Sequence, residues 1–506
     1  MATINVDSFV DSIDPNDDVT TLREAILEAN DGDTIQLEAG TYELSLEGDG
    51  EDAGLTGDLD INGKSLTILG AGQDATIIDA NGIDRVFDVI GNNDVTTITN
   101  VTITGGDDVA GVGAVAGGDG IRVARGNLAL NSSVIHGNQG DGIRVLNGTL
   151  VIMSSTVSEN GRDGISNGFT SSDFTVINST INNNDRDGIF ILGRPSGGDE
   201  SHMNLIGSTI SDNGRHGIIG YFADEILVTN TTISGNGGNG IIDLDFNPSR
   251  VTSSIIANNG HDSVFNRDVV GDFTTGGNNL IGDGDGSTSF TDGVNGDIVG
   301  TTANPIDPRL GPLQDNGGPT LTQALLPDSP AIDAGSNPNT LTTDQRGAAR
   351  VSGERADIGA VEYQLDPDQV IIGTEESDSL TGGSGNDTID GASGDDILTG
   401  GAGRDILTGG QGADRFVFDQ PVGSGIDTLT DFNHNGQGDK LVLDSAAFDL
   451  LDDGLMVVSG ISEAEAQGIG GNALGYTTDG YLFYEGVHFA TLQGTPTLTS
   501  NAIELV

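Results

Sequence analysis

Several residue types are missing or scarce in this chain of 506 residues. It has no cysteine and no tryptophan, only 4% of its residues are aromatic, and its two lysines are Lys64 and Lys440. Disulfide bonds are therefore excluded, although a cysteine-free chain fits both the cytosol and an export route without a signal peptide. No stretch approaches the roughly 18 apolar residues of a membrane helix, so no membrane span is predicted. The opening sequence MATINVDSFVDSIDP lacks the basic and apolar regions of an N-terminal signal peptide.

Positive charge is scarce as well. Nineteen lysine and arginine residues stand against 77 aspartate and glutamate residues, which gives a formal net charge of −58. Such a chain is not expected to bind nucleic acid or anionic membranes, because both need clusters of basic side chains. Carboxylates at this density repel one another unless cations neutralise them, and calcium, which prefers oxygen ligands, is the natural candidate. The alternative is that the acidity only provides solubility or adaptation to salt.

Glycine, by contrast, is abundant. Its 80 residues follow no collagen-like period, which indicates a fold made of many tight turns. The one clear helix signal is a capping box, with Thr21 as the N-cap and Glu24 three residues later. Apolar residues then fall on one face as far as Ala29, and Asn30-Asp31-Gly32 ends the helix. We expect this helix to cap the first coil of the repeat structure that follows.

An internal repeat runs through residues 127–258. It is anchored on six asparagines at spacings of 22, 24, 29, 23 and 22 residues: Asn138, Asn160, Asn184, Asn213, Asn236 and Asn258. Three positions before each asparagine stands Ile or Val, and five positions before it stands Ser or Thr, ending with Ile255 and Ser253. Each repeat offers three short strands with period-2 alternation, and a single repeat cannot bury its apolar side alone.

Stacked copies of the repeat can bury that side. We therefore predict an all-β chain built on a right-handed parallel β-helix, with backbone hydrogen bonds between coils and a ladder of asparagine side chains along the turns. Ile181 and Ile210 are predicted to be buried and adjacent in neighbouring coils. Residues 260–365 lose the repeat and are predicted to form loops and a closing segment.

A stricter repeat of nine covers residues 373–418. Its pattern, Gly-Gly-x-Gly-x-Asp-x-apolar-x, is a known calcium-binding repeat. The aspartates in register are Asp378, Asp387, Asp396, Asp405 and Asp414. Glycines allow turns tight enough to aim carbonyl oxygens at one point, and the carboxylates complete the all-oxygen shell that calcium prefers. The turns expected to supply carbonyl oxygens are at Gly382, Ser384, Gly391, Ser393, Gly400 and Ala402.

The five carboxylates are expected to stack at roughly one strand spacing, about 5 Å. Because the repeat encloses little apolar core, we expect it to be unfolded without calcium and ordered with it. The alternative is a flexible linker rich in glycine and aspartate, which would not need five aspartates in one register.

Residues 373–506 resemble the RTX modules (hemolysin-type calcium-binding repeats) of proteins exported by type I secretion. Besides the nonapeptides, the segment from Asp427 to Phe432 looks like the stretch that follows the repeats in that family. The resemblance implies several calcium ions, ligation by the five aspartates with Asp427 and Asp431 as further ligands, and an uncleaved C-terminal export signal. The first repeat, from Gly373 to Asp378, lacks two glycines, so weaker binding is expected there.

Residues 1–365 resemble bacterial surface β-helix proteins with a CSLREA start and a choice-of-anchor end. The matching stretches are Thr21–Ile26 (with Thr21 in place of Cys), Gly32–Ile35, Gly57–Ile61, Ser329–Gly335, Asp344–Gly347 and Asp357–Glu362. The resemblance implies a surface location and no particular reaction. The expected domains are a cap with the first coils (1–105), β-helix repeats (106–300), a closing segment (301–365) and an RTX module (366–506) after a linker at 366–368.

Parallel β-helices also include pectate lyases and C5-epimerases, and the epimerases carry RTX modules. Their Tyr-Gly-x-Asp-Pro-His and Trp-Ile-Asp-His runs are absent from this sequence, and without tryptophan few rings can stack on sugars. One constellation keeps an enzyme hypothesis open: Arg162, Arg186 and Arg215 recur beside Asp163, Asp187 and His216. An acidic polysaccharide would meet the arginines, with His216 or an aspartate as acid or base. The alternative is a turn ladder of weak ion pairs.

The sequence therefore predicts a calcium-binding protein outside the cell or on its surface, exported without an N-terminal signal peptide. We expect no catalytic activity, a β-helix that acts as a binding or assembly surface, and an RTX module that folds on calcium after export. One alternative is a lyase or epimerase-like enzyme acting on an extracellular polysaccharide. Another is a subunit of a calcium-dependent filament or layer formed by self-assembly.

Overall fold

The computed structural model divides into two compact units. The first contains Met1–Leu325 and Pro330–Tyr363, and the second contains Leu326–Ser329 and Gln364–Val506. The residues outside the described part are 15, 49–51, 92–93, 108–117, 169–171, 194–200, 222–224, 245–248, 261–266, 354, 365–367, 421–424, 446, 449–455 and 470–472. The predicted linker therefore lies outside the described residues except for Asp368.

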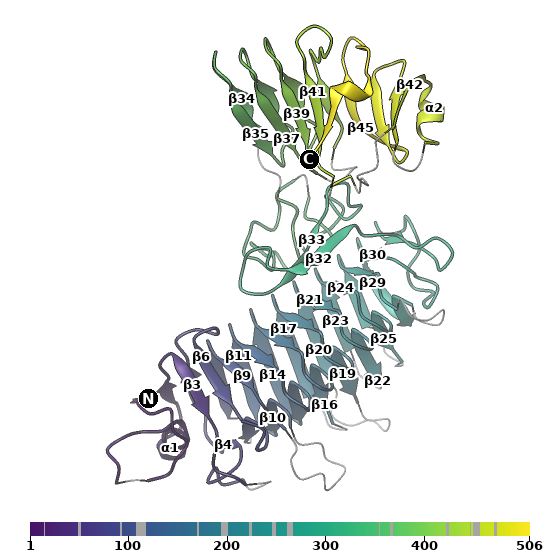
Figure 1. Cartoon of the computed structure of the whole chain (residues 1–506). Helices are drawn as coiled ribbons and strands as arrows, with labels where there is room; N and C mark the ends of the chain where they lie inside the picture. The colour runs from purple at the N-terminus through teal and green to yellow at the C-terminus, as the bar shows by residue number, and fades with distance from the viewer. Residues whose placement is uncertain are drawn as a thin grey trace. The chain divides into compact units, whose positions relative to one another are not determined.

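Three long parallel sheets form the first unit (Figure 1). Sheet A contains β1 (Thr3–Asn5), β2 (Asp33–Gln36), β5 (Leu66–Leu69), β8 (Val95–Thr99), β11 (Asn127–Asn131), β14 (Gly148–Met153), β17 (Ser172–Ile177), β20 (His202–Ile206), β23 (Glu225–Thr229), β26 (Ser249–Thr252) and β29 (Phe273–Gly277). Sheet B contains β3 (Gly40–Glu43), β6 (Thr76–Asp79), β9 (Thr102–Thr104), β12 (Val134–His136), β15 (Thr156–Ser158), β18 (Thr180–Asn182), β21 (Thr209–Ser211), β24 (Thr232–Ser234), β27 (Ile255–Ala257), β30 (Leu280–Ile281) and β31 (Ile298–Val299). Sheet C contains β4 (Leu59–Asn62), β7 (Phe87–Ile90), β10 (Ile121–Ala124), β13 (Ile143–Leu146), β16 (Ile165–Asn167), β19 (Ile189–Leu192), β22 (Ile218–Tyr221), β25 (Ile241–Asp243) and β28 (Val269–Gly271).

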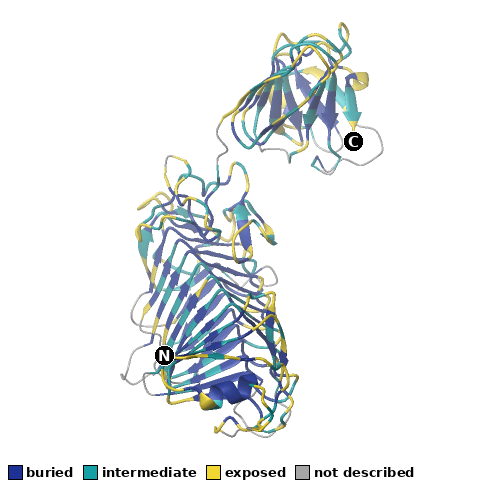
Figure 2. Ribbon diagram, turned by 90° about the vertical axis from the view of Figure 1, so that its left-hand side faces the viewer, coloured by how far each residue is buried: buried dark blue, intermediate teal, exposed yellow. Residues whose placement is uncertain are grey.

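The coils stack in register, as the repeat predicts. Ile181 pairs with Ile210, and Ile210 pairs with Ile233 in the next coil; all three side chains are fully buried. Figure 2 shows the buried residues running along the strands of the stack. The prediction that Ile181 and Ile210 are buried neighbours is confirmed, and so is the parallel β-helix architecture. Apolar and polar residues alternate along these strands because every second side chain of a strand points into the shared core.

The predicted asparagine ladder forms, with one correction. The side-chain amide of each asparagine donates to the next at 2.8–3.0 Å, from Asn138 through Asn236. The last rung is Asn259 and not Asn258, whose backbone is left-handed with φ of 61°. Ile256 accordingly pairs with Ile233, so the predicted register of the last repeat is wrong by one residue. The physical reason is that Asn259 bonds both to Asn236 and to Asp268.

The N-terminal helix is present as predicted. The helix α1 (Leu22–Glu28) begins at Thr21, and the capping box with Glu24 is formed. Arg23 is only 1% exposed, and its Nε lies 2.6 Å from Asp11 Oδ1. The same guanidinium donates to the carbonyl oxygens of Gly57 and Asp58 at 2.8 and 2.9 Å. The stretches that carry the CSLREA resemblance are therefore joined by one buried arginine.

The β-helix does not end where the repeat fades. Strands β28 to β31 extend all three sheets as far as Val299, so the expectation of loops directly after residue 260 is wrong. Asn279 extends the neighbouring ladder of Ser and Thr side chains, because its Oδ1 accepts from Ser254 N–H at 3.2 Å and its amide donates to Asp297 at 3.0 Å. The strands β32 (Leu310–Gln314) and β33 (Thr322–Leu325) then form an antiparallel hairpin.

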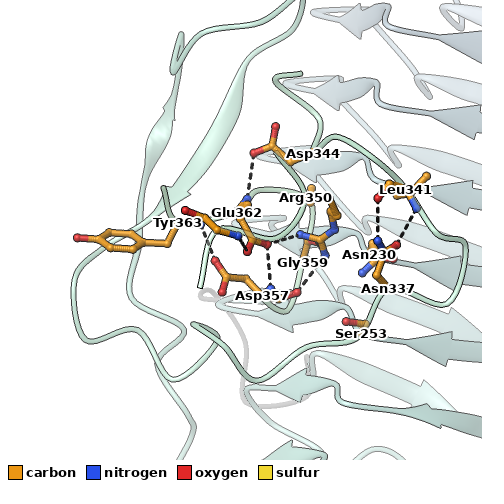
Figure 3. Close-up of polar contacts among 12 residues, drawn as sticks. Asn230, Ser253, Asn337, Leu341, Asp344, Arg350, Asp357, Gly359, Glu362 and Tyr363 are labelled. Atoms are coloured by element: carbon orange, nitrogen blue, oxygen red, sulfur yellow. Dashed lines mark hydrogen bonds and ion pairs between the residues drawn. The ribbon is translucent and has the colours of Figure 1, made fainter. Parts of the chain in front are cut away.

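The closing segment lies along sheet B and is held by buried charges (Figure 3). Ala360 N–H donates to Thr232 Oγ1 at 3.1 Å, and Gly359 N–H donates to Ser253 O at 3.0 Å. Arg350 Nη1 lies 3.0 Å from Glu362 Oε2, and both side chains are buried. Glu362 N–H donates to Asp344 Oδ2 at 3.0 Å. Two of the stretches that carry the choice-of-anchor resemblance, Asp344–Gly347 and Asp357–Glu362, therefore meet in one network.

The second unit is a parallel β-roll with a mixed end piece. Its eight-stranded sheet contains β34 (Val370–Ile372), β36 (Thr388–Asp390), β38 (Ile406–Thr408), β40 (Asp427–Leu429), β45 (Val487–Leu492), β44 (Tyr481–Tyr484), β43 (Ala473–Thr477) and β42 (Met456–Ile461). Its five-stranded sheet contains β35 (Ser379–Gly383), β37 (Ile397–Gly401), β39 (Arg415–Phe418), β41 (Lys440–Leu443) and β46 (Ile503–Leu505). A short helix, α2 (Glu463–Ala466), and a 3₁₀ turn, Ser500–Ala502, complete the unit. None of the helices in the described ranges has the length and hydropathy needed to cross a bilayer.

Two nonapeptides, not one, make each coil of the roll. β34 pairs with β36 and β35 pairs with β37, so residues 18 apart are neighbours. The expected single stack of five aspartates is therefore wrong, because successive nonapeptides enter opposite sheets. The apolar residues at position eight of the repeat are fully buried: Ile389, Leu398, Leu407 and Phe416.

Candidate calcium site

The aspartates of the nonapeptides form two columns. In each column the backbone N–H of one aspartate donates to Oδ1 of the aspartate one coil later, at 2.8–3.1 Å. The column before the eight-stranded sheet contains Asp387, Asp405 and Asp427. The column before the five-stranded sheet contains Asp378, Asp396, Asp414 and Asp439. One carboxylate oxygen of each rung thus fixes the backbone of its neighbour, and the other is left for a different partner.

That second oxygen is buried without a donor in four consecutive repeats. The Oδ2 atoms of Asp387, Asp396, Asp405 and Asp414 have no hydrogen-bond partner in the described part of the chain, and these residues are at most 1% exposed. A Cβ on the first glycine of each repeat would meet Oδ2 at close range, 2.2 Å at Gly382 and 2.1 Å at Gly400. Each Oδ2 therefore lies against a glycine backbone in a space that no side chain fills.

The electrostatics of the columns favours a bound cation. Burial, together with the neighbouring carboxylates, raises the pKa of Asp405 and of Asp414 to about 6. Burial raises the pKa of Asp427 to about 8, with Asp405 adding to the shift. Buried acids of one sign are costly unless an opposite charge pairs with them. Calcium takes six to eight hard oxygen ligands, so these residues fit it, and it would supply the positive charge that the columns lack.

The remaining predicted ligands are placed differently. Asp378 is half-buried, and its Oδ2 accepts hydrogen bonds from Thr374 N–H and Oγ1–H at 2.6 and 2.9 Å. Thr374 thus occupies the oxygen that stays unpaired in the later repeats, and weaker calcium binding at the first repeat stays a prediction. Asp431 accepts from Gly409 N–H and Gly410 N–H at 2.9 and 2.8 Å, so it already closes a turn of the last repeat.

Of the carbonyl groups expected to bind calcium, those of Gly391 and Gly400 lie beside the columns, because each is 2.6 Å from the ideal Cβ position of a glycine that also faces an aspartate Oδ2. The backbone oxygens of Gly400 and Gly409 lie 2.6 and 2.7 Å from the ideal Cβ positions of Gly382 and Gly391, which also face the Oδ2 atoms. The carbonyl of Gly382 differs, because it accepts a hydrogen bond from Gln369 Nε2 at 2.7 Å. Carbonyl and carboxylate oxygens therefore meet beside the glycines at position one.

Sequence reasoning missed Asp439 as a member of the second column. It is 1% exposed, its Oδ1 accepts from Asp414 N–H, and its Oδ2 accepts from Asn433 N–H at 2.7 Å. The sequence contains a signal that could have identified it. In each repeat the aspartate is followed two residues later by an apolar core residue, and Asp439 is followed in the same way by the buried Leu441.

Comparison with known families agrees with this geometry. The description "RTX calcium-binding nonapeptide repeat (4 copies)" matches residues 368–398 and 390–420. The second unit carries RTX calcium-binding repeats. The description "right handed beta helix region" matches residues 67–198 and 155–302, which gives the first unit its handedness. A right-handed β-helix joined to RTX repeats characterises a calcium-binding protein of the exported or surface type.

Solved structures with similar folds are distant. Pectate lyase Pel9A is 18% identical over 72% of this chain and 96% of its own, with a TM-score of 0.49. The A-module of the mannuronan C-5 epimerase AlgE4 from Azotobacter vinelandii is 18% identical over 49% and 78%, with a TM-score of 0.34. A rhamnogalacturonan lyase is 12% identical over 65% and 96%, with a TM-score of 0.39. These likenesses carry no argument about activity.

No curated protein matches the chain. The similarity to CSLREA and choice-of-anchor proteins therefore stays a prediction.

The RTX glycines give a direct prediction. Replacing Gly400 by Ala places a methyl group about where Asp405 Oδ2 lies, which should displace the carboxylate. We expect the calcium concentration at the folding midpoint to rise about tenfold, equivalent to ~1.4 kcal/mol. Circular dichroism during a calcium titration measures this midpoint. Gly468→Ala is the control, because its Cβ would meet only ordinary contacts; equal midpoints for the two variants would contradict the assignment.

The structure also brings the predicted arginine column together. Arg186 N–H donates to Arg162 O at 3.1 Å, and Arg215 N–H donates to Arg186 O at 2.9 Å, so the three lie in consecutive coils. Arg162 Nε lies 3.9 Å from Asp141 Oδ1, and Arg215 Nη1 lies 3.6 Å from Asp187 Oδ2. The ion pairs thus run to the aspartate of the preceding coil, with Asp141 as a partner that the sequence did not suggest.

The neighbouring acids and His216 form a second turn ladder. Asp163 N–H donates to Asp141 Oδ1, Asp187 N–H donates to Asp163 Oδ1, and His216 N–H donates to Asp187 Oδ1, at 2.9–3.1 Å. His216 continues the ladder, since its Nδ1 accepts from the Asn239 N–H at 2.9 Å. Burial lowers the pKa of His216, so the neutral ring that this bond needs is favoured. These side chains order the turns of the β-helix.

Asp119 begins this ladder, since its Oδ1 accepts from Asp141 N–H at 2.9 Å, and it predicts a pH dependence. Burial, aided by Asp141, raises the pKa of Asp119 to about 7, above the ordinary value near 4. The folded state therefore holds a proton that the unfolded state releases, and stability is lost as the pH rises from about 4 through 7. Asp119→Asn should remove the part of this stability loss that comes from Asp119. That part is about 1.4 kcal/mol of unfolding free energy for each unit of difference between the folded and unfolded pKa.

Thermal unfolding of the first unit between pH 5 and pH 8 is the measurement. Asp185→Asn, an exposed residue of a nearby turn, is the control and should leave the slope unchanged. An Asp119→Asn slope identical to that of the parent chain would contradict the prediction.

Proposed function

We propose that the protein is a non-enzymatic structural or interaction protein outside the cell or on its surface. In this proposal the β-helix is the binding or assembly surface, and the RTX unit folds on calcium after export. The observation that carries it is the set of four buried Oδ2 atoms without a hydrogen-bond donor. Extracellular calcium modules bind at roughly 10⁻⁴ to 10⁻³ M, far above cytosolic levels, so such a unit stays unfolded until it leaves the cell.

The regular flank of the β-helix supports the role of the first unit. The outward residues of sheet A line up in register across consecutive coils: Thr97, Ala129, Val151, Thr175, Asn204 and Leu227. These side chains are partly exposed, and they give a regular row without a charged side chain. Repeat stacks use such extended rows to bind long partners.

Location is tested by fractionation. Antibodies against the protein should detect it in the culture medium or on intact cells that express it. Recovery of the folded protein only from the cytosol would refute the proposal. Incubating the purified chain with uronate polymers tests the enzyme alternative, which product formation would establish.

One observation favours the filament or layer alternative. Among the described strands, β34 lies at the edge of the eight-stranded sheet, and Val370 and Ile372 on it are 75% and 69% exposed. Edge strands with exposed apolar residues promote pairing with another chain. Electron microscopy in calcium and in EGTA tests it: particles or fibres that need calcium support self-assembly, and monomers in both exclude it.

The arginine column gives a further prediction. Single Ala replacements of Arg162, Arg186 and Arg215 should each change the free energy of unfolding by less than about 1 kcal/mol, because these ion pairs are long or partly exposed. The triple replacement should leave binding of any acidic polysaccharide intact. Loss of binding or turnover in a triple variant that folds normally would favour the enzyme alternative.

A further inference from the structure

A second group of acids lies in the first unit, far along the sequence from the RTX repeats. On sheet C, Asp60 of β4 is the register partner of Asp88 of β7, and Asp88 is the partner of Arg122 in β10. Two carboxylates directly opposite each other on neighbouring strands destabilise a sheet unless a cation lies between them. Arg122 and Arg85 lie near Oδ2 of Asp88, and Arg122 Nη2 also lies 3.7 Å from Asp52 Oδ1. The other oxygen of Asp88, Oδ1, is buried without a hydrogen-bond donor among the described residues.

A third carboxylate completes the group. Asp52, Asp60 and Asp88 can each offer one oxygen such that all three lie within 4.8 Å of one another. Asp88 and Asp60 are 0% and 4% exposed, whereas Asp52 is exposed. Gly54 N–H donates to Asp60 Oδ2 at 2.9 Å, which holds the loop after Asp52 against β4. Three oxygens therefore converge at a point that is buried on one side and open to water on the other.

The local charge is not balanced by the arginines. Five carboxylates lie here (Asp52, Asp58, Asp60, Asp84 and Asp88), and the two basic side chains that pair with them are Arg85 and Arg122. Five negative and two positive charges leave a formal excess of three negative charges. Asp88 uses Oδ2 for Arg122, and its buried Oδ1 has no hydrogen-bond partner among the described residues.

We propose that Asp52, Asp60 and Asp88 bind one calcium ion. The donor set consists of carboxylate oxygens alone, which suits a hard cation, and water on the exposed side of Asp52 would complete the shell. Asp88 Oδ1, fully buried and without a donor, is the strongest sign of a missing ligand. The site is independent of the RTX repeats and of the function proposed for them.

The site would fasten the cap of the β-helix. Strand β4 is the edge of sheet C among the described strands, since it pairs only with β7. The loop between Asp52 and Asp60 also supplies the Gly54 and Gly57 carbonyls that accept from Arg23 of α1. A calcium ion joining Asp52 to Asp60 and Asp88 would lock this loop over the open edge, where unpaired strands otherwise promote aggregation.

Hydrogen exchange of the full-length chain tests the site separately from the RTX repeats. At calcium roughly ten times its Kd, peptides covering residues 52–62 and 84–90 should exchange about tenfold more slowly than in EGTA. Asp52→Asn should abolish that protection while protection of 373–418 persists, and it should fold because Asp52 is exposed. Asp88→Asn should do the same if it folds. Asp74→Asn, another exposed residue of the first unit, is the control and should behave like the parent chain.

Two outcomes would overturn the proposal. The first is unchanged exchange of 52–62 and 84–90 in calcium up to roughly 5 mM, with the RTX repeats protected; the arginines alone would then balance the acids. The second is calcium protection that persists in Asp52→Asn, which would place the ion elsewhere.

Discussion

Replacing Ile210 by Asp is expected to lower the free energy of unfolding of the β-helix by about 4 kcal/mol, because a charge would be buried without a partner. Ile210 is fully buried between Ile181 and Ile233, in a column where each coil contributes one apolar side chain. The stack cannot open locally to hydrate the carboxylate without breaking backbone hydrogen bonds to both neighbouring coils.

Chemical denaturation followed by circular dichroism measures the loss. Ile206→Asp is the matched control, because Ile206 lies on the neighbouring strand β20 and points away from the core. It should cost less than about 1 kcal/mol, as surface substitutions generally do. Similar losses for the two variants would contradict the register of the β-helix.

The β-helix was predictable where each coil repeats the same residues at the same positions. The isoleucine and asparagine columns are of this kind, because a side chain inside a stack meets its own equivalent in the next coil. The predicted register of the last repeat was wrong for an identifiable reason. The hydroxyl, isoleucine and asparagine positions that define the repeat are each occupied twice in its sequence, Ser253-Ser254-Ile255-Ile256-Ala257-Asn258-Asn259. Both registers satisfy the pattern, and the bonds of Asn259 with Asn236 and Asp268 distinguish them.

The calcium columns were predictable only in part. The nine-residue period identifies the aspartates but does not say that successive nonapeptides alternate between two sheets. Asp439 was missed because residues 415–438 interrupt the period. The sequence also did not predict the cluster of Asp52, Asp60 and Asp88. Their proximity depends on the pairing between β4 and β7 and on a loop conformation that no local pattern encodes.

Removal of calcium is expected to unfold residues 373–418. Each nonapeptide buries one apolar side chain, too little to offset the conformational entropy of nine ordered residues. The aspartate columns add like charges in a buried setting, and the raised pKa values of Asp405 and Asp414 show the cost of ionising them there. With calcium bound, the binding free energy becomes folding free energy. The end piece, with its aromatic core around Phe418, Phe448 and Phe489, should keep more residual structure.

Circular dichroism of residues 364–506, titrated with calcium from an EGTA-treated state, tests this most directly. The account predicts a weak β signal in EGTA that grows to its full value with a midpoint of roughly 10⁻⁴ to 10⁻³ M calcium and is lost again when EGTA is returned. Magnesium, which prefers a smaller octahedral shell and keeps its water, should not replace calcium at the same concentrations. A β signal already complete in EGTA and unchanged by calcium would contradict calcium-driven folding of the RTX unit and the export argument that rests on it.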